Sequence, residues 1–291
     1  MPIPYFRNDE DGRKVAWANE LKVLNVLRVF GHLRRSEIAT ACWPRSSEKS
    51  AYEMAARTVR RMLDDGQLLE RINSLGGCSL VLSPKGAGVL ELAGTPAEAG
   101  YKLAFDGPQF FHRTLGTNYL LSKGKHGHEV FGEYAIIKGM SPVNRDFLRK
   151  NHKKVPDGLI VYSSEVMGYR EGYRGADWVE VESAYKNYED LARVLALLTK
   201  KPELNEAGTL TLNKLVFVYD SRQQHDRPIL RAAQQFLKEH PHLEAEFFLD
   251  AVVLAKCFVD PPFAYHGVVE ESAKSVLEKV HFQDQADDLE R

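Results

Sequence analysis

The chain of 291 residues has few cysteines, no long apolar run and no excess of charge of either sign. Its three cysteines, Cys42, Cys78 and Cys257, are too few and too far apart for a disulfide framework or a zinc site. No stretch reaches the roughly 20 apolar residues of a membrane span, and the N-terminus lacks the pattern of a signal peptide. We therefore expect a cytoplasmic protein without membrane insertion.

The net charge of -1 excludes a wholly basic nucleic-acid coat, but the basic residues are grouped. One group falls within a helical pattern, and another directly precedes Asp157; their members include Arg57, Arg60, Arg61, Lys153 and Lys154. An apolar fraction of 44% with 27% charged residues is ordinary for a globular protein, and the length suits two domains.

The N-terminal third predicts three short helices, a hairpin and a closing helix. Apolar spacing and helix-end signals place the three helices at 20–30, 35–43 and 50–65, with Ser36 as the N-cap of the second. The hairpin is expected at 67–72 and 78–83, and the closing helix at 84–91. This order is typical of a winged helix, whose third helix fits the DNA major groove. Arg57, Arg60 and Arg61 are then expected to contact DNA. The alternatives are a solvated helix face or a protein-interaction module.

The remaining two-thirds alternate between strand and helix patterns, which predicts a mixed sheet flanked by helices and hence an α/β (α+β) fold. The pattern places a basic loop before Asp157 and a βαβ crossover after Glu182. The expected elements are a helix at 111–121, strands at 129–137, 158–162 and 178–183, a helix at 188–198, a strand at 214–219, a helix at 228–239 and a strand at 246–254.

Three acids stand out in two of these strands. Asp157 opens one strand, and Glu180 and Glu182 alternate along the next, so the two glutamates share a face. Burying carboxylates together is costly unless a cation neutralises them, and hard oxygen ligands suit Mg²⁺ or Mn²⁺. The alternative is that Asp157 is a turn residue and the glutamates form the solvent face of an edge strand.

The ordered motifs resemble the PD-(D/E)XK nucleases, which have the restriction-endonuclease fold. The matching motifs are Pro156-Asp157-Gly158 and Glu180-Val181-Glu182. The family's usual lysine is replaced by Ser183, and Lys186, one turn later, takes its place in this comparison. Adding His112-Arg113-Thr114-Leu115-Gly116-Thr117-Asn118 and Glu133, residues 20–220 resemble MobC-type plasmid mobilisation relaxases of the replication-relaxation group.

The resemblance implies an arm at 1–19, a winged helix at 20–95, a linker at 96–108, a nuclease-like domain at 109–270 and a tail at 271–291. It implies that Asp157, Glu180 and Glu182 hold Mg²⁺ or Mn²⁺, with Glu133 as a fourth acid or second-metal ligand. Lys186 is expected beside the nucleophile or the phosphate. Lys153 and Lys154 would steer the DNA backbone toward the acids.

The activity implied is nicking of one strand at a plasmid origin of transfer during conjugative mobilisation. The expected partners are double-stranded plasmid DNA, a nicked or single-stranded product and accessory mobilisation proteins. The attacking group is either metal-activated water or a tyrosine, for which Tyr185 and Tyr188 are candidates. Two alternatives stay open: a non-catalytic winged-helix protein of plasmid replication or transcription control, favoured by the missing lysine, and a restriction or repair nuclease.

Overall fold

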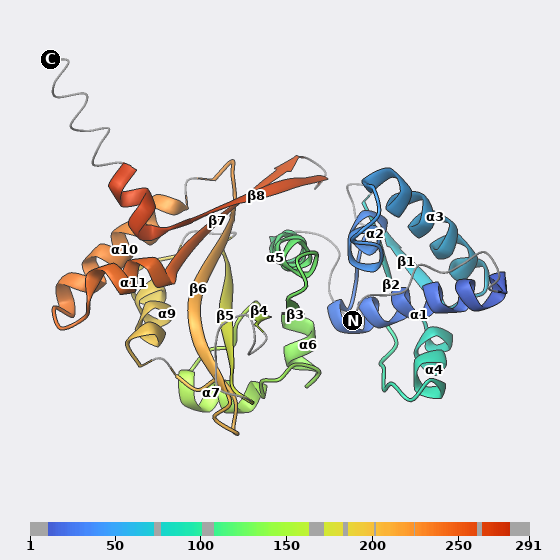
Figure 1. Ribbon diagram of the computed structural model, residues 1–291, viewed down its shortest axis with the longest axis horizontal. Helices are drawn as coiled ribbons and strands as arrows, with labels where there is room; N and C mark the ends of the chain where they lie inside the picture. Colours follow the sequence, from blue (N-terminus) through green and yellow to red (C-terminus); the bar gives the residue numbers. More distant parts are fainter. Residues whose placement is uncertain are drawn as a thin grey trace, which may run out of the picture. The chain divides into compact units, whose positions relative to one another are not determined.

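The computed structural model describes residues 11–72, 77–100, 108–162, 172–182, 186–200, 202–223, 225–260 and 264–279. The chain divides into two compact units, Met1–Phe105 and Asp106–Arg291, with the boundary inside the range 96–108 expected as a linker. The protein is mixed α/β, with a two-stranded antiparallel sheet and a six-stranded mixed sheet (Figure 1), so the predicted fold class is confirmed. Within the described ranges, no helix is both long and apolar enough to cross a membrane.

The N-terminal unit has the predicted order of elements. Its helices and strands are α1 (Gly12–Phe30), α2 (Arg35–Cys42), α3 (Glu48–Asp64), β1 (Leu68–Ile72), β2 (Cys78–Leu82) and α4 (Pro84–Leu92). β1 and β2 form an antiparallel hairpin. The hydroxyls of Ser47 and Ser83 accept hydrogen bonds from backbone N–H groups in the first turns of α3 and α4, which explains where both helices begin.

Two details of this unit differ from the predictions. α1 begins at Gly12, so residues 12–19 are helical and do not belong to an arm. The N-cap of α2 is Arg34, not Ser36. The carboxylate of Glu37 accepts a hydrogen bond from the backbone N–H of Arg34 and forms an ion pair with its guanidinium at 2.7 Å. This reciprocal contact starts the helix two residues earlier than a cap at Ser36 would.

The C-terminal unit is built on a sheet with the order β3-β4-β5-β6-β7-β8. β5, β6 and β7 are parallel, and the other neighbouring pairs are antiparallel. The parallel pair β5 and β6 is joined through α9 (Tyr188–Lys200), which confirms the βαβ crossover. The strands are β3 (Glu129–Gly132), β4 (Gly158–Val161), β5 (Arg174–Glu182), β6 (Leu210–Asp220), β7 (Val252–Asp260) and β8 (Ala264–Ser272).

Helices cover both faces of this sheet (Figure 1). α5 (Pro108–Gly124) lies on one face, and α9, α10 (Asp226–Glu239) and α11 (Ala245–Ala251) lie on the other. The hydrophobic core of the second layer includes Trp178, Phe217 and Phe236. On the first face, a Cβ at Gly116 would lie 2.9 Å from Val181, and one at Gly158 would lie 2.7 Å from Leu120. Glycine at these two positions therefore lets α5 approach β4 and β5 closely.

Three predicted elements of this unit were wrong in part. The strand expected at 129–137 ends at Gly132, and Glu133 begins α6 (Glu133–Ile137). The expected basic loop contains α7 (Arg145–His152), which Asn144 caps. The strand expected at 246–254 is mostly α11, because its first six residues are helical and β7 begins at Val252. The expected tail contributes residues 271–272 to β8, and residues 273–279 are helical.

Candidate active site

Glu180 and Glu182 lie on one face of β5, as their alternation predicts, and they are 1% and 2% exposed. β5 is the third strand of the sheet and is paired on both sides. The alternative of an exposed edge strand is therefore wrong. Two carboxylates at the end of a central strand are stable only with hydrogen-bond or cationic partners.

The Glu180 carboxylate has three such partners. Its Oε1 accepts a hydrogen bond from the indole Nε1 of Trp178 at 2.7 Å. Its Oε2 accepts one from the ammonium of Lys154 and lies 3.5 Å from the Nζ of Lys186. Trp178 orients the carboxylate from within the core, while both lysines are about 30% exposed and reach it from the solvent side.

Lys186 connects the two glutamates. Its Nζ donates to Glu182 Oε1 at 2.6 Å, in addition to its contact with Glu180. The sequence prediction placed Lys186 beside the acids as a substitute for the usual lysine, and the structure brings it there. Ser183 lies outside the described residues.

Asp157 joins the cluster from the residue before β4. Its Oδ2 accepts a hydrogen bond from the backbone N–H of Val181 at 2.8 Å, and its Oδ1 lies 3.2 Å from the Nε2 of His112. His112 lies one turn before Gly116 on α5, so the close approach of that helix brings the imidazole to the carboxylate. The interpretation of Asp157 as a simple turn residue does not account for these two contacts.

The surroundings shift the pKa values of the three carboxylates differently. Burial raises the pKa of Glu180, the nearby Asp157 raises it further, and Lys154 and Lys186 oppose both effects. Burial also raises the pKa of Glu182 against the effect of Lys186. For Asp157, burial acts upward, but the His112 contact and the Val181 N–H hold its pKa below the usual value. The three carboxylates are thus unequal, with Asp157 the most readily ionised.

Glu133 lies at the margin of this cluster. Its carboxylate pairs with the guanidinium of Arg113 at 2.9 Å, and it helps to raise the pKa of His112 against the effect of burial. It belongs to the first turn of α6, not to a strand as predicted. Its contact with Arg113 makes it part of the surroundings of His112.

The other predicted residues of this unit are placed differently. Lys153 ends α7 in a left-handed conformation (φ 59°), and its ammonium donates to the Lys150 carbonyl. The Tyr188 hydroxyl donates to Glu239 on α10 at 2.5 Å, and burial and this contact raise its pKa to about 12. A hydroxyl that is hard to deprotonate is a poor nucleophile. Tyr185 lies outside the described residues.

In the N-terminal unit, Arg57, Arg60 and Arg61 are exposed on α3, as predicted for a DNA-contacting helix. Arg61 forms an ion pair with Glu20 of α1 at 2.6 Å, so it also ties two helices of the unit together. Arg57 and Arg60 are therefore the better candidates for contact with phosphates.

A third buried acid on β5, Asp177, faces α5 on the opposite side of the sheet. The Tyr162 hydroxyl donates to it at 2.5 Å, and the Asn213 amide donates at 2.9 Å. Burial raises its pKa, with both hydrogen bonds acting in the opposite direction. This carboxyl is held mainly by neutral donors.

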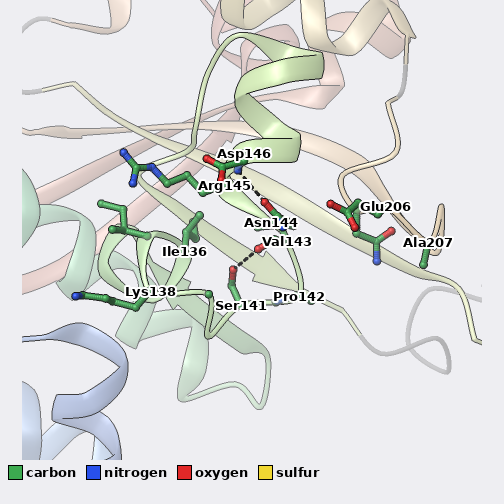
Figure 2. Close-up of a pocket in the computed structure, with 13 residues that line it drawn as sticks. Ile136, Lys138, Ser141, Pro142, Val143, Asn144, Arg145, Asp146, Glu206 and Ala207 are labelled. Atoms are coloured by element: carbon green, nitrogen blue, oxygen red, sulfur yellow. Dashed lines mark hydrogen bonds between the residues drawn. The ribbon is translucent and has the colours of Figure 1, made fainter. Parts of the chain in front are cut away.

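A polar groove of about 600 Å³ lies elsewhere in the C-terminal unit. Figure 2 shows it between the start of α7 and the turn before β6, with the Asn144 side chain bonded to the Asp146 backbone. Lys138, Arg145, Asp146 and Glu206 give it mixed charge. Asp157 and the acids of β5 do not line it.

The donor set of the acid cluster consists of hard oxygen ligands, which fits Mg²⁺ or Mn²⁺. Among the described residues, no three His, Cys, Asp or Glu side chains are grouped closely enough to hold a metal ion. Lys154 and Lys186 neutralise Glu180 and Glu182 in this arrangement.

Comparison with protein-family models, curated proteins and solved structures found no match to this chain. The site is therefore described by its own geometry. Sequence reasoning missed His112 and Trp178 as partners of the acids. The motif from His112 to Asn118 pointed to the right helix segment, but no spacing in the sequence connects it to Asp157 across 45 residues.

Proposed function

We propose that this protein is a metal-dependent DNA endonuclease that nicks one strand, of the relaxase type suggested by its motifs. The observation that carries the proposal is the convergence of Asp157, Glu180, Glu182 and Lys186 at the end of one central strand. Acids and a lysine together suit phosphodiester cleavage, which needs both a cation site and a positive charge beside the phosphate.

Asp157 and Glu180 are the residues that would hold the divalent ion. Such an ion supplies positive charge to the phosphate and lowers the pKa of a water or hydroxyl. Lys154 and Lys186, which contact Glu180, are partly exposed, so their ammonium groups are placed to meet a phosphate oxygen. Glu182 keeps Lys186 beside the reaction, where its ammonium offsets charge that develops on the phosphate.

Two further residues support these ligands. The His112 imidazole orients Asp157, and the Trp178 indole orients Glu180. Hydrogen bonds of this kind keep a carboxylate ready for a metal, and losing one typically costs about 10- to 100-fold in affinity or activity. We assign both residues a positioning role.

DNA recognition belongs, in this proposal, to the N-terminal unit acting as a winged helix at a plasmid origin of transfer. The exposed Arg57 and Arg60 on α3 support it. The Tyr188 contact with Glu239 favours activated water over that tyrosine as the attacking group.

The test is conversion of supercoiled plasmid to the open circle with Mg²⁺ or Mn²⁺. The wild-type protein is expected to nick the plasmid, and Glu180→Gln and Asp157→Asn are expected to remove the activity. Arg193→Ala, on an exposed face of α9, serves as the control. Equal nicking by the wild type and both acid variants would refute the proposal. A linear product would indicate a restriction or repair nuclease.

A second candidate is a non-catalytic DNA-binding protein of plasmid replication or transcription control. The lysine contacts with Glu180 and Glu182 favour it, because they neutralise the acids without a metal. Calorimetric titration with Mn²⁺ separates the two. Binding that disappears in Glu180→Gln supports the enzyme, and no binding to the wild type supports the regulator.

A further inference from the structure

The acid cluster lies where the parallel strands β5 and β6 end side by side. Glu182 pairs in register with Tyr219, so the ends of the two strands meet at one edge of the sheet. The helices that follow them, α9 and α10, pack against each other. In open sheets with parallel strands, ligands bind outside these carboxyl ends. The segment after β6 is therefore a natural continuation of the site.

That segment carries Arg222, whose guanidinium is oriented by a buried aspartate. Asp220, the last residue of β6, is 1% exposed and accepts hydrogen bonds from the Arg222 guanidinium, through Nε at 2.9 Å and Nη2 at 2.5 Å. The backbone N–H of Arg222 also donates to this carboxylate at 3.0 Å. The arginine side chain nevertheless stays 47% exposed. A guanidinium oriented in this way is suited to paired contacts with a phosphate.

The next residues present polar atoms that lack partners. The Oε1 of Gln223 and the Nε2 of His225 are buried and accept or donate no hydrogen bond within the described part of the chain. Leaving such groups unpaired costs about 1–3 kcal/mol each, so their retention calls for an explanation. Burial lowers the pKa of His225, Asp226 and Asp220 oppose this effect, and Lys186 acts in the same direction as burial.

We propose that the carboxyl end of β6 is a second DNA subsite, in which Arg222, Gln223 and His225 hold the nucleotide next to the scissile phosphodiester. The Arg222 guanidinium contacts its phosphate. The partly exposed side chains of Gln223 and His225 contact its base or sugar. This inference rests on the proposed nicking activity. It places the DNA strand across the carboxyl ends of β5 and β6, which lie about 4.8 Å apart as neighbouring β-strands do.

The test measures binding of a short fluorescent single-stranded oligodeoxynucleotide by anisotropy. The full-length chain is used in EDTA, so that no cleavage occurs, and with excess unlabelled duplex, which occupies a duplex-binding N-terminal unit. Arg222→Ala is expected to weaken binding about tenfold and to lower the salt slope by about 0.7, the value for one phosphate contact on a single strand. His225→Ala and Gln223→Ala are expected to weaken binding about fivefold each.

Folding is checked with the same variants. The unpaired atoms of Gln223 and His225 mean that their alanine variants lose no internal hydrogen bond there, so their melting temperatures should not fall. Arg222→Ala leaves Asp220 without its cation, and the double variant Asp220→Asn/Arg222→Ala removes both charges together. Arg193→Ala is the matched control, because Arg193 is an exposed arginine that also pairs with a nearby aspartate, Asp190, three residues before it.

The outcomes separate this inference from the proposed function. Wild-type-like binding by Arg222→Ala and His225→Ala, or an equal loss in Arg193→Ala, would overturn the subsite even if the protein nicks plasmid. Binding that depends on Arg222 and His225 in a protein that nicks nothing would support the subsite and leave the nicking proposal refuted.

Discussion

β5 carries buried acids on both of its faces, and the acids on the two faces have different kinds of partner. Asp177 faces α5 and is held by the Tyr162 hydroxyl and the Asn213 amide. Glu180 faces the opposite layer and is neutralised by Lys154 and Lys186, which remain partly exposed. Neutral donors within a packed layer complete a structural hydrogen-bond network. The lysines at the solvent edge neutralise the acids of the other face, where our proposal places the divalent ion.

The strongest test of this difference removes one charge from each face. Glu180→Gln is expected to lower plasmid nicking at least about a hundredfold, because the amide cannot replace a carboxylate as a metal ligand. Asp177→Asn makes the same chemical change three residues away and is expected to stay within about threefold of the wild type. Initial rates of open-circle formation measure both. Similar losses in the two variants would remove the functional distinction between the faces.

The free energy of unfolding should depend more on Asp177 than on the acids of the other face, the reverse of the order expected for activity. Asp177→Ala leaves the Tyr162 hydroxyl and the Asn213 amide without their acceptor and is expected to lower the free energy of unfolding by about 2 kcal/mol. Glu182→Ala leaves Lys186 with its second contact to Glu180 and is expected to cost less, about 1 kcal/mol. Urea denaturation followed by circular dichroism measures the difference. A larger cost for Glu182→Ala would identify its face as the structural one.

Metal binding should stabilise the protein through one face alone. At about 100 times its dissociation constant, Mn²⁺ is expected to add about 2.7 kcal/mol of stability, which corresponds to several degrees in the melting temperature. The same shift is expected for Asp177→Asn, and none for Glu180→Gln. Thermal melts with Mn²⁺ and with EDTA measure it, and a shift that survives in Glu180→Gln would place the metal elsewhere.

The smallest expected effect is a pH dependence from Asp177. Burial raises its pKa in the folded state above the usual value of an aspartate, so the folded protein keeps a proton that the unfolded chain has released. Its contribution to stability is fully present below the unfolded pKa and is lost as pH rises through the folded pKa. The stability of the wild type relative to Asp177→Asn should therefore decrease from about pH 4 toward neutrality. Urea midpoints across this range test the sign, which a rising difference would contradict.

The sequence predicted the acid cluster because local spacing determines it. Alternation in β5 places Glu180 and Glu182 on one face, and Lys186 follows Glu182 by four residues, close enough to contact it. The partners His112 and Lys154 depend on pairing and packing between distant elements. The approach that brings His112 to Asp157 requires Gly116, a constraint visible only once α5 packs on the sheet.

The wrong elements have local causes. The segment from Glu246 to Leu254 is an apolar run that suits a helix or a strand equally, and length alone does not separate them. Glu133 follows Gly132, where the chain changes from strand to helix without a proline or a polar turn to indicate it. The edge-strand alternative failed because the number of neighbours of β5 depends on β6, which follows after the whole of α9.

The six-stranded sheet has the same order in space as in the chain, which bears on how the protein folds during synthesis. Each strand after β3 pairs with the strand that precedes it in the chain, so the sheet can form one strand at a time during synthesis. Lys154 emerges before Glu180, and Lys186 emerges four residues after Glu182. Both ammonium groups are thus available before α10 is made and covers that face, and the nascent chain never has to bury its carboxylates uncompensated.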